Sequence, residues 1–261
     1  MEGGVVVRRQ DFVAWEGPSS IDGSPIAVIV TGVSRPSANV KTGPMLQVWI
    51  LRQDVHPWEA VKTGQDSAIC GECPMRGTGN GELRACYVRV ETGPSAIWRK
   101  YAKGGYPVPE PDVWARWVHR RDVRLGAYGE PTAAPPSVMH ALAGQSRMWT
   151  GYTHRWAELS LAGKGEVWRT VLMASVESDQ QAQDAMRLGW RPFLALPGDE
   201  PVPEHAFLCP AEREDDPLQC MDCGACAGTK MGGRRAAAVY PYVPMHGHGR
   251  KNYRRMLQVV S

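Results

Sequence analysis

Seven cysteines in two separate groups constrain this chain more than any other feature of its sequence. Cys70, Cys73 and Cys86 form a group of three, and the group of four is Cys209, Cys220, Cys223 and Cys226. A cubane iron–sulfur cluster takes four thiolates, so four cysteines can close one cluster while three leave one iron open. An open metal position is where metal sites do chemistry, as catalytic zinc illustrates. The sequence therefore predicts one reactive and one closed metal centre.

The spacing of the last three cysteines is the strongest local motif. They form a Cys-x2-Cys-x2-Cys run, which bacterial ferredoxins use for a cubane cluster. Cys209, eleven positions before Cys220 and next to Pro210, is the candidate fourth ligand. A four-cysteine zinc site uses similar short spacings and stays open as an alternative. The tight triple spacing favours iron and sulfide over zinc.

The composition is that of a globular protein from a reducing compartment. The chain has 261 residues, 43% of them hydrophobic, which is enough for a sizeable core. Its first residues contain no apolar region typical of a signal peptide. The longest apolar run near them, residues 26–30, is far too short to span a membrane. We therefore expect a cytoplasmic protein without membrane contact, whose thiols ligate metal instead of forming disulfides.

Predicted strands and helices alternate through the middle of the chain, which indicates an α/β fold with a parallel sheet. We expect strands over residues 26–30, 46–51, 123–128, 148–153, 170–176 and 193–196. Helices are expected from Pro111, over residues 136–143 ended by Gly144, and from Ser178 to Gly189. The strand count favours a partial or irregular (β/α) barrel.

The same patterns divide the chain into three stretches. Residues 1–37 form an N-terminal segment with β structure. Residues 38–200 form the partial barrel, with a cysteine-bearing loop over 53–93. Residues 201–261 form a C-terminal cysteine-rich cap with a basic tail.

Polar residues follow four of the predicted strands, where loops of parallel sheets carry chemistry. The first loop holds Cys70 to Cys86, the second holds residues 126–131, the third holds His154 and Arg155, and the fourth holds Ser175, Glu177 and Ser178. These four loops are expected to meet on one rim. Tyr152, His154 and Arg155 would then face a substrate, although His154 fits a hydrogen-bonded rim histidine equally well.

Three cysteines after a strand, ending in Cys86-Tyr87, resemble the cluster loop of radical S-adenosylmethionine (SAM) enzymes. Gly126-Ala-Tyr-Gly129-Glu130-Pro131 resembles the Gly-Gly-Glu motif of that family. The Cys-x2-Cys-x12-Cys spacing departs from the usual Cys-x3-Cys-x2-Cys. The closer resemblance is to a phage-encoded, radical-SAM-like group. It rests on residues 39–44, the cysteine loop, Gly93-Pro94, Trp98-Arg99 and the late cysteines, in scattered motifs over residues 38–255.

The resemblance implies a radical SAM barrel and two [4Fe-4S] clusters, the second one auxiliary. The open iron of the first cluster would bind SAM, and one electron from a donor such as flavodoxin would cleave it to a 5′-deoxyadenosyl radical. The residues expected to contact SAM are Tyr87, Gly126, Gly129, Glu130, Ser175 and Glu177. His246 and His248, which precede a basic segment, join Tyr152, His154 and Arg155 as catalytic candidates.

The charge distribution suggests an anionic partner. Residues 227–261 hold seven bases and no acid, namely Lys230, Arg234, Arg235, Arg250, Lys251, Arg254 and Arg255. Such a segment fits a nucleic acid or nucleotide, although it also fits an ordinary solvated face. Together with the resemblance, it makes rearrangement of a hypermodified thymine in phage DNA a candidate reaction, in the host cytoplasm. Two other classes stay open: a zinc-stabilised nucleic-acid-binding protein, and an iron–sulfur protein without SAM chemistry.

Overall fold

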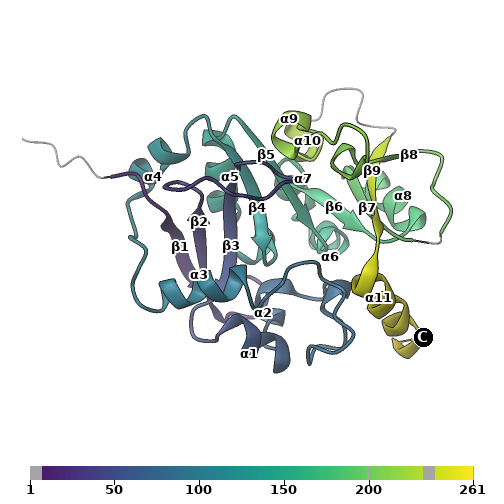
Figure 1. The fold of residues 1–261 in the computed structure, drawn as a ribbon, viewed down its shortest axis with the longest axis horizontal. Coiled ribbons are helices and arrows are strands. Elements are labelled where there is room, and N and C mark those ends of the chain that lie inside the picture. Colours follow the sequence, from purple (N-terminus) through teal and green to yellow (C-terminus); the bar gives the residue numbers. More distant parts are fainter. Residues whose placement is uncertain (1–7, 199, 232–238, 261) are drawn as a thin grey trace, which may run out of the picture.

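A nine-stranded sheet forms the centre of the computed structural model, which describes residues 8–198, 200–231 and 239–260 (Figure 1). The strand order is β1-β2-β3-β4-β5-β6-β7-β9-β8. The first two pairings are antiparallel, and every pairing from β3 to β8 is parallel. The strands are β1 (Phe12–Pro18), β2 (Pro25–Thr31), β3 (Leu46–Arg52), β4 (Asp122–Tyr128), β5 (Met148–Thr153), β6 (Met173–Val176), β7 (Pro192–Pro197), β8 (Ala206–Leu208) and β9 (Tyr240–Met245).

Short helices connect these strands. They are α1 (Pro57–Lys62), α2 (Ser67–Cys70), α3 (Gly93–Tyr101), α4 (Pro111–Val118), α5 (Pro136–Gln145), α6 (Trp156–Leu161), α7 (Gly165–Arg169), α8 (Asp179–Arg187), α9 (Cys220–Cys223), α10 (Gly228–Met231) and α11 (Gly247–Val260). Trp114, Trp117 and Val118 of α4 are buried in the main core, as their helical spacing predicts. The result is an α/β fold with a mostly parallel sheet, compatible with a partial α/β barrel.

The strands of the central part lie where the sequence predicts them. The hairpin of β2 and β3, the strands β4, β5 and β7, and the helix α4 match their expected ranges. The predicted cap of α8 is also confirmed, because the Ser178 hydroxyl accepts a hydrogen bond from the backbone N–H of Gln181. The pattern of apolar residues and the capping side chains are therefore enough to locate the strands and helices of this part of the chain.

Two predicted boundaries are wrong. Gly144 does not end α5, which continues to Gln145. A Cβ at Gly144 would meet no neighbour, so this glycine marks an open helix surface and not a chain reversal. The strand expected from residue 170 begins only at Met173, because the N–H groups of Val171 and Leu172 both donate to the Trp168 carbonyl. These residues continue the turn that ends α7.

The C-terminal tail is part of the sheet. β9 lies between β7 and β8 and carries Pro241 and Pro244. One sheet therefore runs through all three stretches into which the sequence was divided. Beyond β9, α11 packs against the cysteine loop in a small second core of Met75, Ala85, Ala195, Met245, Tyr253 and Met256. None of the helices in the part of the chain that the structure describes is long and apolar enough to cross a membrane.

Candidate functional site

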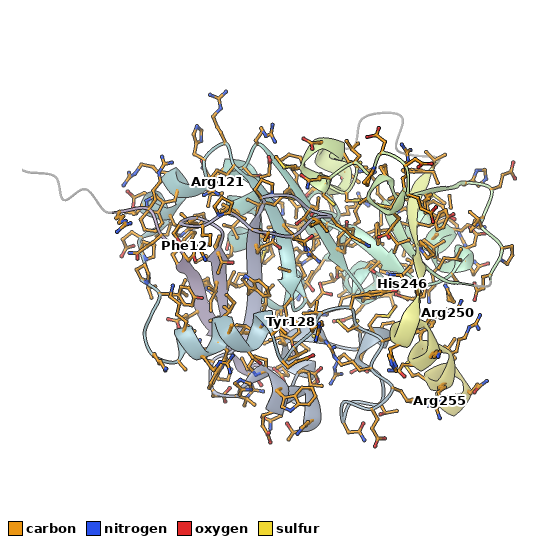
Figure 2. The ribbon with its side chains drawn as sticks, in the orientation of Figure 1. Phe12, Arg121, Tyr128, His246, Arg250 and Arg255 are labelled. Carbon is orange, nitrogen blue, oxygen red and sulfur yellow. The ribbon has the colours of Figure 1, made fainter. Side chains whose placement is uncertain are left out.

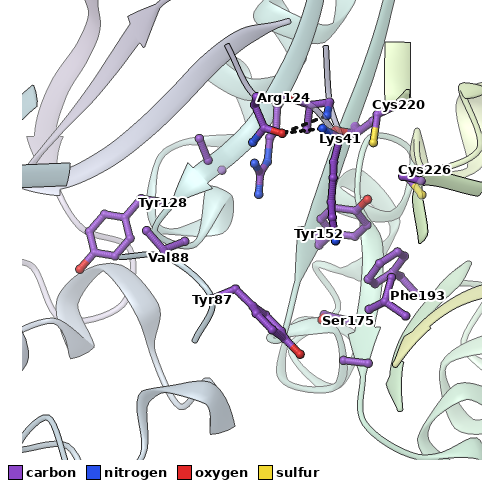
Figure 3. A pocket seen from close by; sticks show the side chains of 18 of the residues that line it. Lys41, Tyr87, Val88, Arg124, Tyr128, Tyr152, Ser175, Phe193, Cys220 and Cys226 are labelled. Carbon is purple, nitrogen blue, oxygen red and sulfur yellow. Dashed lines mark hydrogen bonds between the residues drawn. The ribbon is translucent and has the colours of Figure 1, made fainter. Parts of the chain in front are cut away.

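A cavity of about 810 Å³ lies against one face of the sheet and holds both cysteine groups (Figure 3). Alternate residues of each strand line it, because successive side chains of a strand point to opposite faces. The residues that share this face are Gln47 and Trp49 of β3, Arg124, Gly126 and Tyr128 of β4, Thr150 and Tyr152 of β5, Ser175 of β6, Phe193 and Ala195 of β7, and Pro241 and Val243 of β9. Parallel pairing thus assembles the wall of the cavity from distant parts of the sequence.

The first cysteine group lies on the loop that follows β3. Cys70 ends α2, and the N–H of Cys73 donates to the Cys70 carbonyl. Cys86 approaches them because the N–H groups of Ala85 and Cys86 both donate to the Met75 carbonyl. The three thiols are close enough to act on one another electrostatically. Cys70, Cys73 and Cys86 therefore lie together at the cavity, and the metal centre expected of them stays a prediction.

Arg76 holds the irregular part of this loop in shape. Its guanidinium donates to the carbonyls of Gly64 and Gly71 and pairs with the buried Asp66 carboxylate at 2.7 Å. A loop of this length without regular structure is unusual in a compact domain unless it serves a function. Here the buried guanidinium fixes the backbone on either side of the first cysteines.

Glu130 lies at the edge of the same site, directly after β4. Its backbone N–H donates to the Ile69 carbonyl at 2.6 Å, next to Cys70. Its carboxylate accepts hydrogen bonds from the Thr132 hydroxyl and from the backbone N–H of His154. The side chain lines the cavity and is only 5% exposed. The predicted Gly-Glu-Pro motif is therefore attached to the cysteine loop by hydrogen bonds.

His154 connects the first cysteine group to the end of β6. Its side chain hydrogen-bonds to Cys73 and lies 3.0 Å from the Glu177 carboxylate, measured from Nε2 to Oε1. Both atoms are buried, and neither has a hydrogen-bond partner among the described residues. Burial alone would lower the pKa of His154, but the negative charges of Cys73 and Glu177 together raise that pKa well above its ordinary value. His154 therefore lines the cavity and is also held by neighbouring side chains at its rim. Its catalytic role stays a prediction.

The surroundings of the first group favour neutral thiols until a cation binds. Burial raises the pKa of Cys70 and of Cys86, and the neighbouring thiols add to this effect for both. Tyr128 lies close to Cys70 and Cys86, and burial raises its pKa as well. Its hydroxyl is buried and has no hydrogen-bond partner among the described residues. An acceptor bound to these thiols would supply the missing partner.

The second cysteine group lies where the tail passes the start of β3. Cys220 and Cys223 bound the single turn of α9, which Gly224 ends in a left-handed conformation (φ 65°). The N–H of Cys220 donates to the Lys41 carbonyl, and the N–H of Cys209 donates to Tyr242 of β9. Burial raises the pKa of Cys220 to about 11 and that of Cys226 to about 12, and Cys209 acts on both thiols. The four cysteines therefore lie together, as predicted.

Tyr152 joins the second group to β5. Its hydroxyl hydrogen-bonds to Cys226, and its ring packs on Phe193 with centroids 4.5 Å apart. The N–H of Gly151 donates to the Cys226 carbonyl, which fixes the last cysteine against the strand. Tyr152 lies on β5 and His154 follows its last residue, Thr153. The end of this strand therefore brings one side chain to Cys226 and another to Cys73, one cysteine from each group.

The mouth of the cavity is formed by the cysteine loop and the tail. Tyr87 is half exposed, and its ring lies 5.7 Å from that of His246, just before α11. Asn252 of α11 donates to the Arg84 carbonyl at 2.8 Å. Figure 2 shows His246, Arg250 and Arg255 along this border of the molecule. The bases Arg234 and Arg235 of the predicted basic tail lie outside the described residues.

Most of the predicted site residues meet in this cavity, but three do not line it. The cavity-lining residues from the prediction are the seven cysteines, Tyr87, Gly126, Gly129, Glu130, Tyr152, His154, Ser175 and His246. Glu177 lies behind His154, and His248 is exposed. Arg155, expected to face a substrate, is buried outside the cavity, where it pairs with Glu158 and donates to the Thr132 hydroxyl. It turns away because α6 begins directly after it.

Arg124, Tyr128 and Phe193 are among the cavity-lining residues that sequence reasoning missed. Each occupies a strand position whose alternation pattern was used only to predict the strand. The signal was present, because Arg124, Gly126 and Tyr128 have the period of two that places them on one face.

The described side chains form no preorganised site for a single metal ion: no group of three or more His, Cys, Asp or Glu among them has the required geometry. Four sulfurs around one zinc ion lie at about 2.3 Å from it, hence close to one another. A cubane is a larger body, so thiolates that hold it are spread further apart.

Comparisons with protein-family models, with curated proteins and with solved structures found no significant match to this chain.

Proposed function

We propose that this protein is a radical SAM enzyme with an auxiliary iron–sulfur cluster. The observation that carries the proposal is the convergence of Cys70, Cys73 and Cys86 with Glu130 at the carboxyl edge of a parallel sheet. This is the edge at which α/β folds place their chemistry. A complete set of four further thiols lies in the same cavity, separate from the first set.

The residues of both groups suit iron–sulfur clusters. Three mutually close thiols leave one metal position open, and the partnerless Tyr128 hydroxyl lies beside them. The four thiols of the second group leave none. When bound, such a three-thiolate cluster supplies the electron that cleaves SAM reductively to a carbon radical. The Cys-x2-Cys-x2-Cys spacing of the last three cysteines is the ground on which clusters are preferred to the zinc alternative.

The protein's own part is to bind and orient SAM. The Glu130 carboxylate, fixed by Thr132 and His154, is a preformed acceptor for the methionyl amino group. Gly126 and Gly129 have positive φ values of 78° and 82°, which turn the chain after β4 toward the cysteine loop. Ser175 offers a hydroxyl to the ribose or carboxylate, and Tyr87 at the mouth packs against the adenine. Burial of the site keeps water from a reactive intermediate.

A nucleic acid or nucleotide is the proposed substrate class, with a thymine derivative in phage DNA as the candidate. The support is α11, which packs on the cysteine loop and carries the exposed bases Lys251 and Arg255. A base reaches a buried site of this kind only when it is flipped out of the duplex. A flavodoxin-like donor would supply electrons from outside.

The test is metal and sulfide analysis of anaerobically prepared protein, with the reduced EPR spectrum recorded with and without SAM. We expect about eight iron per chain, from two four-iron clusters, and a spectrum that changes when SAM is added. The triple variant C70A/C73A/C86A should lose half of the iron and the SAM response. The triple variant C220A/C223A/C226A should lose the other half and keep the response. Zinc without iron after reconstitution would refute the proposal, and iron whose spectrum ignores SAM would leave a cluster protein without SAM chemistry.

A further inference from the structure

Arg124 is the feature of the cavity that the cysteine chemistry does not explain. It lies on β4 on the same face as Tyr128, partly buried, and its side chain projects into the cavity on the side of Cys220 and Cys226 (Figure 3). Arg124 lies four residues before the end of β4 at Tyr128. It is therefore set back from the edge where SAM would bind.

The guanidinium of Arg124 has no acidic partner, in contrast to the other basic side chains of the cavity. Lys41 pairs with Glu212, and Arg89 pairs with Glu91 at 3.5 Å. The strand neighbours of Arg124 are Gln47 on β3 and Thr150 on β5, both uncharged. Among the described residues, its electrostatic partners are the Tyr152 hydroxyl and the Cys220 thiol.

We propose that Arg124 binds the anionic group of the substrate, a carboxylate or a phosphate, between the two cysteine groups. A guanidinium presents paired N–H donors that match the two oxygens of such groups. The remaining wall is aromatic, formed by Trp49, Tyr152 and Phe193. The cavity volume lies in the range of small-molecule sites. The bound molecule is therefore a small anion with a flat or apolar body, or one nucleotide unit extruded from a strand.

Binding of an anion by Arg124 does not depend on the proposed function. Only the statement that this anion is the substrate rests on it. The experiment uses two pairs of probes, each with a charged and an uncharged member: thymidine 5′-monophosphate with thymidine, and benzoate with benzyl alcohol. Their affinities are measured by anaerobic calorimetry on the full, cluster-loaded chain, without turnover. The variants are R124M, which removes the charge, and R124K, which keeps the charge but not the paired donors. R116M is the control, because Arg116 is an exposed, ion-paired arginine on α4.

We expect the wild type and R116M to bind the charged member of at least one pair more tightly than the uncharged one. R124M should lose this preference, with a fall of about tenfold or more for a charge-assisted hydrogen bond. R124K should be intermediate. The pair with the larger preference identifies phosphate or carboxylate. Circular dichroism and iron content show whether each variant is folded and loaded.

Two outcomes would overturn the proposal. The first is equal binding of charged and uncharged probes by the wild type. The second is unchanged probe affinity in R124M with a shift only in the reduction potential of the second cluster, which would make Arg124 a counter-charge for Cys220 and its neighbours. A protein without iron would refute the proposed function, while the affinity ratio for the probes could still be read from it.

Discussion

Single side chains decide what each cysteine group can do. Glu130 is held by hydrogen bonds from Thr132 and from the backbone of His154, so its carboxylate cannot turn away from the cavity. The Tyr152 hydroxyl hydrogen-bonds to Cys226, and Cys220 also acts on it. Each of these two side chains can be tested by removing one functional group.

Replacing Glu130 with Gln should weaken SAM binding by tenfold or more while iron content stays unchanged. The substitution removes the negative charge that attracts the methionyl amino group, and charge-assisted hydrogen bonds are the strong ones. Equilibrium dialysis with SAM on the reconstituted protein measures this. The matched control is Glu158→Gln, since Glu158 is an exposed carboxylate paired with Arg155 outside the cavity. Equal SAM affinity in both variants would exclude Glu130 from the SAM site.

Replacing Tyr152 with Phe should lower the reduction potential of the second cluster and leave that of the first unchanged. A hydrogen bond to a thiolate favours the more negative, reduced state. The loss of one bond of about 1 kcal/mol corresponds to about 40 mV for one electron. EPR-monitored redox titration resolves the two clusters. Tyr240→Phe is the control, because the Tyr240 hydroxyl bonds to Asp179 and not to a cysteine. A shift of the first cluster instead would contradict the assignment.

At the scale of elements, the turn after β4 brings the glutamate motif to the cysteine loop. Gly129 has a φ of 82°, and a Cβ there would lie 2.7 Å from the Ile50 carbonyl oxygen of β3. The ends of β3 and β4 thus approach more closely than a side chain allows. This packing makes the hydrogen bond from Glu130 to Ile69 possible.

Gly129→Ala should therefore lower the free energy of unfolding by about 1–3 kcal/mol, through backbone strain and the clash with β3. Urea denaturation measures the change. Gly144→Ala is the matched control: it lies inside α5 with open space around it, and should be neutral or stabilising by up to about 1 kcal/mol. Comparable losses in both variants would show that the turn is not the strained element.

The helix α11, which packs on the cysteine loop, carries the exposed bases Lys251 and Arg255. The double variant K251E/R255E should weaken binding of single-stranded DNA and reduce the slope of log affinity against log salt by about 1.4, since each phosphate contact on a single strand contributes about 0.7. Fluorescence anisotropy at several salt concentrations measures both. Binding that is unchanged at every salt concentration would remove α11 from the proposed DNA surface.

The elements that the sequence predicts have clear local patterns, whereas the strand that it missed depends on tertiary contacts. Strands such as β4 and β5 have clear alternation or apolar runs, and α8 has a capping side chain, so local rules locate them. β9 carries Pro241 and Pro244, which local rules exclude from a central strand. It is nevertheless paired on both sides, because tertiary contacts with β7 and β8 decide its conformation.

The two cysteine groups were predicted separately, but their common cavity depends on strand order, which spacing alone does not encode.

At the scale of the whole molecule, the tail closes the cavity at two places. Near the second cysteine group, Cys220 and Gln219 bond to the carbonyls of Lys41 and Val40, and Lys41 pairs with Glu212. Near the first group, α11 packs on the cysteine loop. The tail therefore contacts the segment before β3 and the segment after it.

Removing the metal should loosen the first of these contacts. Chelation under reducing conditions is expected to lower Tm and to raise hydrogen exchange in residues 39–43 and 209–226 together, because backbone bonds connect these two segments. Exchange in β2 and β3 should change little, since both strands are buried. Hydrogen-exchange mass spectrometry before and after chelation measures this. Increased exchange in 209–226 alone would show that the segments are independent.

The order of Tyr152 and His154 along the chain has a consequence for the two cysteine groups. Tyr152 lies at the end of β5 and His154 follows the strand directly. One short stretch of backbone therefore places one side chain beside Cys226 and another beside Cys73. A displacement of the end of β5 would act on both groups at once.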